Sequence, residues 1–230
     1  MVYHYINLAL LWLMRLALLI SGPYLLWQGD SLGLLALIAF VVTFIPTFLR
    51  ARYDINLPWW LELLIVAGLF LDIIVGSEFA VYRLITGFDW FTHLLGTFIV
   101  SLIAFSIVFS LKVTRRIYVT NGMIWFFTVV FALAVGSSYE IMEFIVDLIF
   151  GANSQVNLTN TMLDLIFDLA GGIITATWGT YYLTRLQGRR VNDVLDPYIK
   201  LLRVAGVRIR REARKLRKHR HFIPHEKRHG

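Results

Sequence analysis

The sequence contains no cysteine, and this absence excludes several kinds of chemistry. Without thiols the chain cannot form a disulfide, use a thiolate nucleophile or bind a metal through sulfur. Charged residues are also scarce, at 16% of the chain, whereas 58% of the residues are hydrophobic. Soluble domains are typically about 45–50% apolar. The composition therefore indicates an integral membrane protein.

Several familiar signals are missing as well. The chain has only five prolines, no low-complexity linker and no internal repeat, which favours one membrane domain and does not suggest an inverted-repeat transporter. It has no P-loop and no G-x-S-x-G, H-E-x-x-H or G-x-G-x-x-G motif. The first twenty residues lack a basic start and an A-x-A site, so we expect a retained helix and not a cleaved signal.

The apolar residues gather in six runs, each close to the length that crosses a bilayer. A transmembrane helix needs about 17–25 residues, and lipid favours helices because they satisfy their backbone hydrogen bonds internally. We therefore predict an all-α fold, a polytopic six-helix transmembrane bundle over residues 1–184. The predicted spans are Leu8–Trp27, Leu32–Leu49, Trp59–Gly76, Trp90–Leu111, Met123–Phe150 and Met162–Leu183.

Lys and Arg are distributed unevenly among the predicted loops. The positive-inside rule places Lys-rich and Arg-rich loops in the cytoplasm. It predicts a multi-pass protein of the cell inner (cytoplasmic) membrane with both termini in the cytoplasm. The loops after the second and fourth runs contain Arg50, Arg52, Lys112, Arg115 and Arg116, whereas the alternate loops contain only Arg83.

Residues 185–230 form a strongly basic tail. They contain 15 Lys and Arg against 4 Asp and Glu, whereas residues 1–184 contain 7 against 11. The pattern that follows Pro197 predicts a basic amphipathic cytoplasmic helix over about 197–220, suited to anionic lipid headgroups. Interleaved aromatic residues, which stack on bases, are missing from the tail, so we expect no nucleic-acid partner.

Carboxylates within the predicted spans raise the free energy of inserting the chain into the membrane. A charge at the bilayer centre costs roughly 2.5–3.5 kcal/mol, so scattered lipid-facing carboxylates would be hard to stabilise. With the predicted orientation they gather in the outer half of the bundle, where we expect them to meet around water, a cation or a counter-charge. The ionisable residues of this outer half are Asp72, Asp89, His93, Glu140, Glu143, Asp147, Asp164 and Asp168.

These residue types match the ligands of a divalent cation. We predict a site for one Mg, Mn or Zn ion formed by His93, Glu140, Glu143, Asp164 and Asp168, because oxygen ligands and one imidazole suit these metals. His93 and Glu143 are also the candidate catalytic acid or base.

Structural roles that involve no metal are also possible for several of these residues. Asp89 and Asp147 are expected to face water at the interface. Asn160 is a candidate N-cap of the sixth helix, and Asp164 could complement the dipole of that helix. Arg15, near mid-depth of the first run, is a candidate internal counter-ion.

One segment also carries a family resemblance. It contains E-x-x-E-F-x-x-D from Glu140 to Asp147, F-G-x-N-x-Q from Phe150 to Gln155, and T-M-x-D-L-x-x-D from Thr161 to Asp168. With these motifs the stretch Gly136–Ile174 resembles the YjdF-like family of uncharacterised bacterial inner-membrane proteins and, more loosely, VanZ-like membrane proteins. The family pattern has an aspartate where this chain has Asn160. The resemblance implies a six-helix membrane protein without an established activity.

Three functions remain open from the sequence. The first is a metal-dependent enzyme that acts on a lipid or envelope precursor at the outer leaflet. The second is a proton- or cation-coupled transporter, which requires a polar path inward to Arg15 and Glu62. The third is a non-catalytic scaffold in which the carboxylates form a structural polar network.

Overall fold

The computed structural model describes residues 2–151, 155, 157–185 and 189–206. Within these residues the chain forms helices and no strands, which confirms the predicted all-α class. The elements in order are α1 (Val2–Trp27), α2 (Leu32–Val42), α3 (Ile45–Tyr53), α4 (Trp59–Phe70), the π-helix η1 (Leu71–Glu78), α5 (Val81–Leu84), α6 (Phe88–Val113), α7 (Asn121–Phe150), α8 (Leu158–Arg185) and α9 (Arg189–Val204).

In the part of the chain that the structure describes, six segments are long and apolar enough to cross a membrane. Each overlaps one predicted span and extends it by a few residues at one or both ends, so the six-helix bundle is confirmed. The segments are Ile6–Trp27, Leu32–Tyr53, Trp59–Glu78, Phe88–Val113, Asn121–Ile149 and Leu158–Tyr182.

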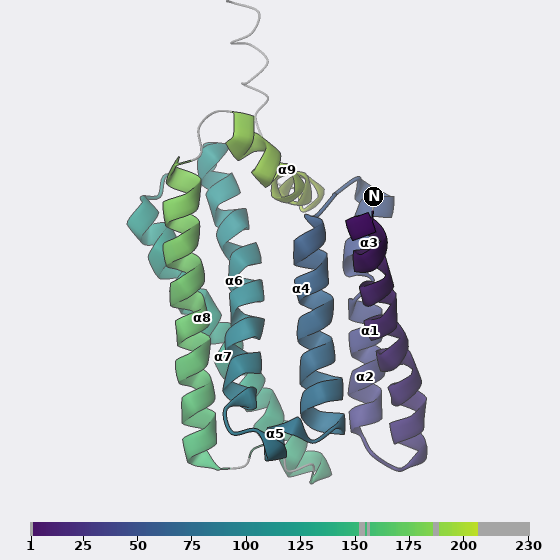
Figure 1. Cartoon of the computed structure of the whole chain (residues 1–230). Helices are drawn as coiled ribbons and strands as arrows, with labels where there is room; N and C mark the ends of the chain where they lie inside the picture. The colour runs from purple at the N-terminus through teal and green to yellow at the C-terminus, as the bar shows by residue number, and fades with distance from the viewer. Residues whose placement is uncertain (1, 152–154, 156, 186–188, 207–230) are drawn as a thin grey trace, which may run out of the picture.

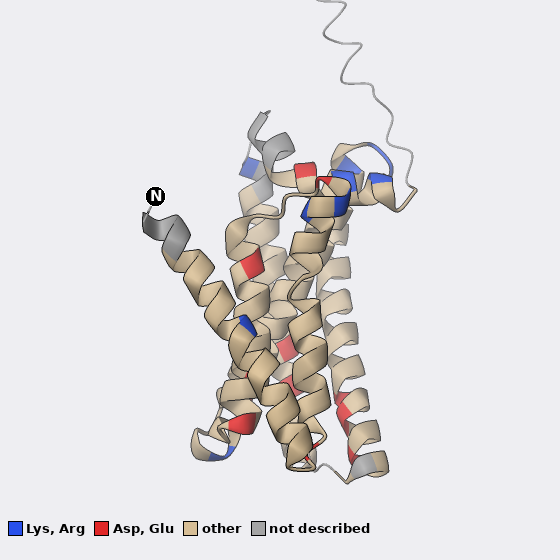
Figure 2. Cartoon of the chain, turned by 90° about the vertical axis from the view of Figure 1, so that its right-hand side faces the viewer, with Lys and Arg blue, Asp and Glu red and all other residues tan. Residues whose placement is uncertain are grey.

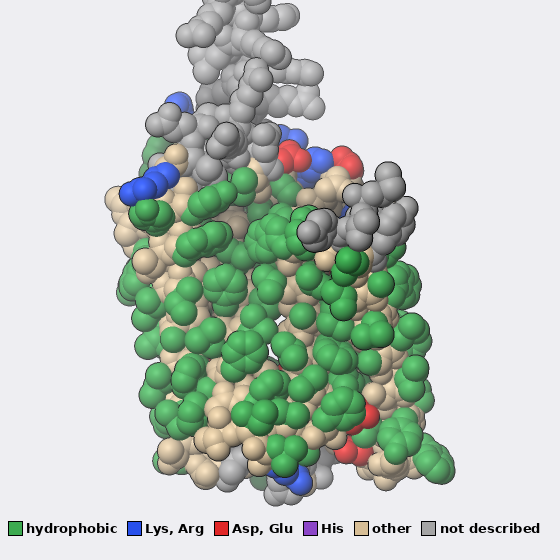
Figure 3. Space-filling model, viewed as in Figure 1, with side chains coloured by type: hydrophobic (Ala, Val, Ile, Leu, Met, Phe, Trp, Pro, Cys, Tyr) green, Lys and Arg blue, Asp and Glu red, His purple; other side chains and the backbone are tan. Residues whose placement is uncertain are grey.

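The face of the bundle seen in the space-filling view is largely covered by apolar side chains (Figure 3). Leu13, Ile20 and Leu148 expose 64%, 68% and 74% of their surface. Soluble proteins rarely expose large contiguous apolar patches. A surface of this kind is typical of helices that are surrounded by lipid.

The second span is interrupted, which differs from the uninterrupted run that we predicted. Helix α2 ends at Val42 and α3 begins at Ile45. Pro46 lies at the start of α3 and lacks the N–H that would bond to the Val42 carbonyl, and its ring would clash with that carbonyl. A proline is tolerated in the first turn of a helix, so the chain begins a new helix there.

The helices form two groups that lie side by side (Figure 1). Helices α6, α7 and α8 pack against one another, and α1 packs against α2 and α4. The contact between α6 and α8 depends on Gly171, because an added Cβ would lie 2.5 Å from Thr97 Oγ1 and 2.7 Å from the Leu94 carbonyl oxygen. This close approach brings the polar faces of α6 and α8 together.

Helix α9 begins at Arg189, earlier than the predicted start at Pro197, and Pro197 lies inside it. The predicted helix also included residues 207–220, which lie outside the described residues. Leu195 and Tyr198 of α9 are buried in the core cluster that contains Phe105 of α6. Helix α9 therefore lies across one end of the bundle and packs against α6.

An ion pair fixes α9 to the loop before α4. Lys200 Nζ lies 2.8 Å from Asp54 Oδ2 and donates to the Asp54 carbonyl at 2.8 Å. The hydrogen bond from Lys200 lowers the pKa of the Asp54 carboxyl, and its own hydrogen bond to Asp54 raises the pKa of the Lys200 amine. Both groups are charged near neutral pH.

The two ends of the bundle differ in charge. The N-terminal end of α1 and helix α9 lie at one end, here called the tail end, and the loop between α1 and α2 lies at the other, here called the cluster end (Figure 1). Most Lys and Arg residues of the described chain gather at the tail end (Figure 2). The carboxylates that the sequence analysis singled out are largely nearer the cluster end.

Candidate metal centre

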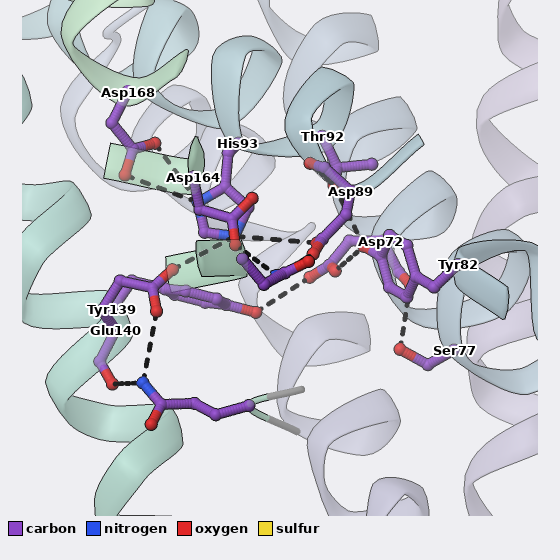
Figure 4. A network of polar contacts seen from close by, with 12 residues as sticks. Asp72, Ser77, Tyr82, Asp89, Thr92, His93, Tyr139, Glu140, Asp164 and Asp168 are labelled. Carbon is purple, nitrogen blue, oxygen red and sulfur yellow. Dashed lines mark hydrogen bonds and ion pairs between the residues drawn. The ribbon is translucent and has the colours of Figure 1, made fainter. Parts of the chain in front are cut away.

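His93 lies at the centre of a buried polar cluster at the cluster end (Figure 4). It occupies the second turn of α6, and its side chain is 8% exposed. Its Nδ1 atom lies 3.3 Å from Asp168 Oδ1, and its Nε2 atom lies 3.7 Å from Glu140 Oε1 and 3.8 Å from Asp89 Oδ1. Carboxylates therefore face both nitrogens of the ring.

Three helices position these side chains. Asp89 and His93 are four residues apart on α6, and Asp164 and Asp168 are four residues apart on α8, so each pair shares one helix face. Glu140 comes from α7. Asp164 and Asp168 are each 1% exposed and Glu140 is 5% exposed, so these carboxylates are out of contact with bulk water.

Asp89 belongs to this cluster, although the sequence favoured a position facing water. Its side chain is 27% exposed, and Oδ2 accepts a 2.7 Å hydrogen bond from Asn160 Nδ2. The same Asn160 amide donates to Asp164 Oδ2 at 2.6 Å. One neutral amide therefore joins the two carboxylates, which would otherwise repel one another.

Asn160 is thus not the N-cap of α8, and this prediction was wrong. Helix α8 begins at Leu158, and the side chain of Asn157 accepts a 3.0 Å hydrogen bond from the Asn160 backbone N–H. This contact is the one that an N-cap residue makes with the third helical residue. Asp164 lies in the second turn, fully buried, so it does not merely complement the start of the helix.

Among the described residues, two buried carboxylate oxygens of the cluster, Glu140 Oε1 and Asp164 Oδ1, have no hydrogen-bond partner. His93 Nε2 lies 3.7 Å from Glu140 Oε1, which is too long for a hydrogen bond. One ligand atom from each of Asp89, His93 and Asp164 lies within 4.8 Å of the other two. Atoms that share one cation at bond lengths of about 2.0–2.2 Å lie at most about 4.4 Å apart, so these three residues could hold a divalent cation after a small movement of their side chains.

The other predicted residues occupy different positions. Glu143 lies on α7 and is half-buried, and within the described chain no hydrogen bond or ion pair joins it to His93. Asp147 is partly buried, and its Oδ2 accepts a 2.8 Å hydrogen bond from the Gln155 backbone N–H. Gln155 also donates to Glu140 Oε2 at 3.3 Å. Gln155 is therefore held by two carboxylates of α7, Asp147 and Glu140.

A second carboxylate site adjoins the cluster and was not assigned partners from the sequence. Asp72, in the π-helix η1, accepts hydrogen bonds from Tyr82 Oη at 2.5 Å and from Tyr139 Oη at 3.3 Å. The Tyr139 ring packs edge-on to His93. Burial, with the Asp72 carboxylate beside it, raises the pKa of the Tyr82 phenol, which therefore stays a donor. π-Helical turns often occur at functional sites, and hydropathy does not reveal them.

Arg15 does not reach this cluster. Its Nη2 atom lies 3.1 Å from Glu62 Oε1 and donates to the Thr43 carbonyl at 2.7 Å, at the break between α2 and α3. Arg50 pairs with the other oxygen of Glu62 at 3.0 Å. Arg15 is therefore an internal counter-ion of Glu62, not of the carboxylates near His93.

An apolar layer separates Glu62 from the cluster. Glu62 and Asp72 are ten residues apart, which corresponds to about 15 Å along a helix. Between them Val66 is fully buried and packs with Leu11 and Met14. Apolar side chains therefore lie between Glu62 and Asp72.

Comparison with known proteins gives a family. The DUF2238 family, described as predicted membrane proteins, matches residues 6–185. Searches of curated proteins and of solved structures found no match. The matched region contains all six membrane segments and every residue of the cluster, and it is consistent with the resemblance to YjdF-like proteins. Because the match covers most of the chain, the protein belongs to the DUF2238 family of predicted membrane proteins.

Proposed function

We propose that the protein is a metal-dependent membrane enzyme with one divalent cation, Mg, Mn or Zn, bound at the cluster end. The buried oxygens of Glu140 and Asp164 that lack a hydrogen bond carry this proposal. A buried polar atom without a hydrogen bond costs about 1–3 kcal/mol, and more when it is charged. A cation beside His93 would satisfy both oxygens.

The contacts of His93 indicate which residues would hold the cation. Nδ1 faces Asp168, and a neutral imidazole that donates its N–H there leaves the lone pair of Nε2 free for a metal. Glu140 and Asp89 face Nε2. We therefore assign His93, Asp89, Glu140 and Asp164 as ligands, and Asp168 as the residue that orients the ring.

A bound divalent cation would act as a Lewis acid that polarises a phosphoryl or acyl oxygen. Glu143 is our candidate for proton transfer. It lies three residues after Glu140, so both project from the same face of α7. It is half-buried and makes no hydrogen bond to the cluster in the described chain, which leaves its carboxyl group available to a substrate.

The charge distribution supports a site in the outer leaflet. Cytoplasmic loops carry an excess of Lys and Arg, and most of these residues lie at the tail end (Figure 2). We place the tail end in the cytoplasm, facing anionic headgroups of the inner membrane, and the cluster end outside. The substrate class is then a lipid or envelope precursor that reaches the outer leaflet.

Elemental analysis of the full-length protein purified in detergent tests this function. We expect one divalent metal per chain in the wild type and a loss of that metal in His93→Ala and Asp164→Ala, since both remove a ligand. Asp30→Asn is the matched control. Asp30 is an exposed carboxylate at the same end that accepts a hydrogen bond from the Leu32 N–H, and an asparagine oxygen can replace it.

Two results of the metal analysis would reject the metalloenzyme. Well-folded wild-type protein that holds no stoichiometric metal after incubation with Mg, Mn or Zn would leave no role for these ligands. Equal metal content in wild type, His93→Ala and Asp30→Asn would show that the ion is bound elsewhere.

The carboxylates on both ring nitrogens also favour a second candidate, a structural network. A protonated His93 could form ion pairs with Asp168 on one side and with Glu140 on the other. In that case the protein contains no metal, and His93→Ala lowers the yield of folded protein. The same measurements therefore distinguish the two functions.

A further inference from the structure

A cavity lies at the tail end, away from the cluster. Its volume is about 360 Å³, and its walls come from the start of α4, from α6, from α8 and from α9. This volume is within the range of about 300–1,000 Å³ that is typical of small-molecule sites. Most of the lining is apolar or aromatic, and it includes Trp60, Leu102, Phe105, Trp178, Tyr182 and Val194.

The cavity extends from the helix ends into the apolar part of the bundle. Phe105 lies eight residues before the end of α6 at Val113, and Gly179 lies six residues before the end of α8 at Arg185. At 1.5 Å per residue these two residues lie roughly 9–12 Å below the ends of their helices, and Leu102 of the lining lies deeper still. The cavity therefore begins near the headgroup level and continues at the depth of lipid acyl chains.

The mouth of the cavity has the residues that suit a lipid headgroup. Trp178 and Tyr182 stack with their ring centroids 5.1 Å apart, and both are about half exposed. Trp and Tyr are enriched at the membrane–water interface. Arg185 follows Tyr182 by three residues, and its guanidinium lies 4.0 Å from the centroid of the Tyr181 ring. A positive charge thus lies one helical turn beyond the aromatic wall.

We propose that this cavity binds one acyl chain of a phospholipid from the surrounding bilayer, with the lipid phosphate near Arg185. The apolar wall and its depth fit a hydrocarbon chain, and the Arg185 charge complements a phosphate. The Ser106 side chain, which also lines the cavity, needs no polar ligand, because its hydroxyl donates a hydrogen bond to the Leu102 carbonyl at 2.7 Å. The bound lipid would fill the space between α8 and α9 and hold α9 against the bundle.

Native mass spectrometry of the full-length protein in detergent tests the proposal, with palmitoyl-oleoyl phosphatidylglycerol as the added lipid. We expect the wild type to retain one lipid per chain. Val194→Phe fills the cavity from α9, and a roughly tenfold loss of bound lipid is expected because the larger ring takes the place of lipid carbons. Val204→Phe is the control, since Val204 is an exposed residue of the same helix that does not line the cavity.

Asn56→Phe provides an independent test from the loop before α4 if Val194→Phe does not fold. Arg185→Gln should weaken retention while leaving the cavity open, and unchanged retention in Arg185→Gln would refute the phosphate contact. Equal retention in Val194→Phe, Asn56→Phe and Val204→Phe would overturn the acyl-chain site. A doubled chain mass in place of a lipid mass, lost in Val194→Phe and kept in Val204→Phe, would instead identify the cavity as an interface with a second copy.

Discussion

At the scale of single residues, a glycine decides whether Asp168 can reach His93. A Cβ atom added to Gly136 of α7 would lie 2.0 Å from Asp168 Oδ2, a distance that real Cβ atoms do not adopt. Asp168 is fully buried, so it has little room to move away. The sequence did not reveal this contact, because the approach of another helix cannot be inferred from one helix alone.

We therefore predict that Gly136→Ala destabilises the protein by about 1–3 kcal/mol, the usual cost of forcing an extra methyl group into a packed site. The substitution should also displace Asp168 from His93. Thermal unfolding of the purified protein in detergent measures the loss. If Gly136→Ala unfolds at the wild-type temperature, the close contact between α7 and Asp168 is wrong.

Gly96→Ala is the matched control for that measurement. Gly96 is also inside a helix, but an added Cβ would meet nothing within 4 Å. Alanine has a higher helix propensity than glycine by about 1 kcal/mol. Gly96→Ala should therefore leave the stability unchanged or raise it slightly.

The sequence predicted most residues of the cluster but did not predict that Asp89 belongs to it. His93, Glu140, Asp164 and Asp168 were predicted because helical spacing and similar depth in the membrane bring them together. Asp89 was assigned to the interface because it lies at the start of a helix. Its inclusion depends on the Asn160 amide, a contact between α6 and α8 that spacing within one helix does not reveal.

At the scale of the elements, one buried carboxylate joins three helices. Glu62 of α4 binds Arg15 of α1 and Arg50 of α3. The Arg15 side chain is 4% exposed, whereas that of Arg50 is 50% exposed. The two ion pairs should therefore contribute very differently to stability.

We predict that Glu62→Gln is strongly destabilising, because it leaves Arg15 buried without a counter-charge. Breaking a buried pair in this way costs about 3–5 kcal/mol. Arg50→Gln removes the exposed partner and should cost at most about 1 kcal/mol. Denaturation of both variants in the same detergent gives the comparison, and equal losses would contradict the burial of Arg15.

Element boundaries show where hydropathy is informative and where it is not. Hydropathy located all six membrane segments to within a few residues, because lipid requires long uninterrupted apolar stretches. It missed the break before Pro46 and the extension of α9 before Pro197, since both depend on backbone hydrogen bonds and not on apolarity. It also missed η1, whose wider turns carry Asp72.

At the scale of the whole molecule, the two ends of the bundle have different chemistry. The tail end holds most Lys and Arg residues together with the amphipathic helix α9 (Figure 2). The cluster end holds His93 and its carboxylates. For a membrane protein with this asymmetry the positive-inside rule predicts a single orientation, with the basic end in the cytoplasm.

The lack of native cysteine makes this orientation directly testable. We predict that Gln28→Cys, in the loop between α1 and α2 at the cluster end, reacts with a membrane-impermeant maleimide in intact bacterial cells. Tyr118→Cys, in the loop between α6 and α7, should react only after the cells are permeabilised. Both positions are exposed, and Tyr118 exposes 92% of its surface, so access to the reagent decides the result. The cysteine-free parent gives the background, and the reverse labelling pattern would place the cluster in the cytoplasmic leaflet and remove the outer-leaflet substrate from the proposed function.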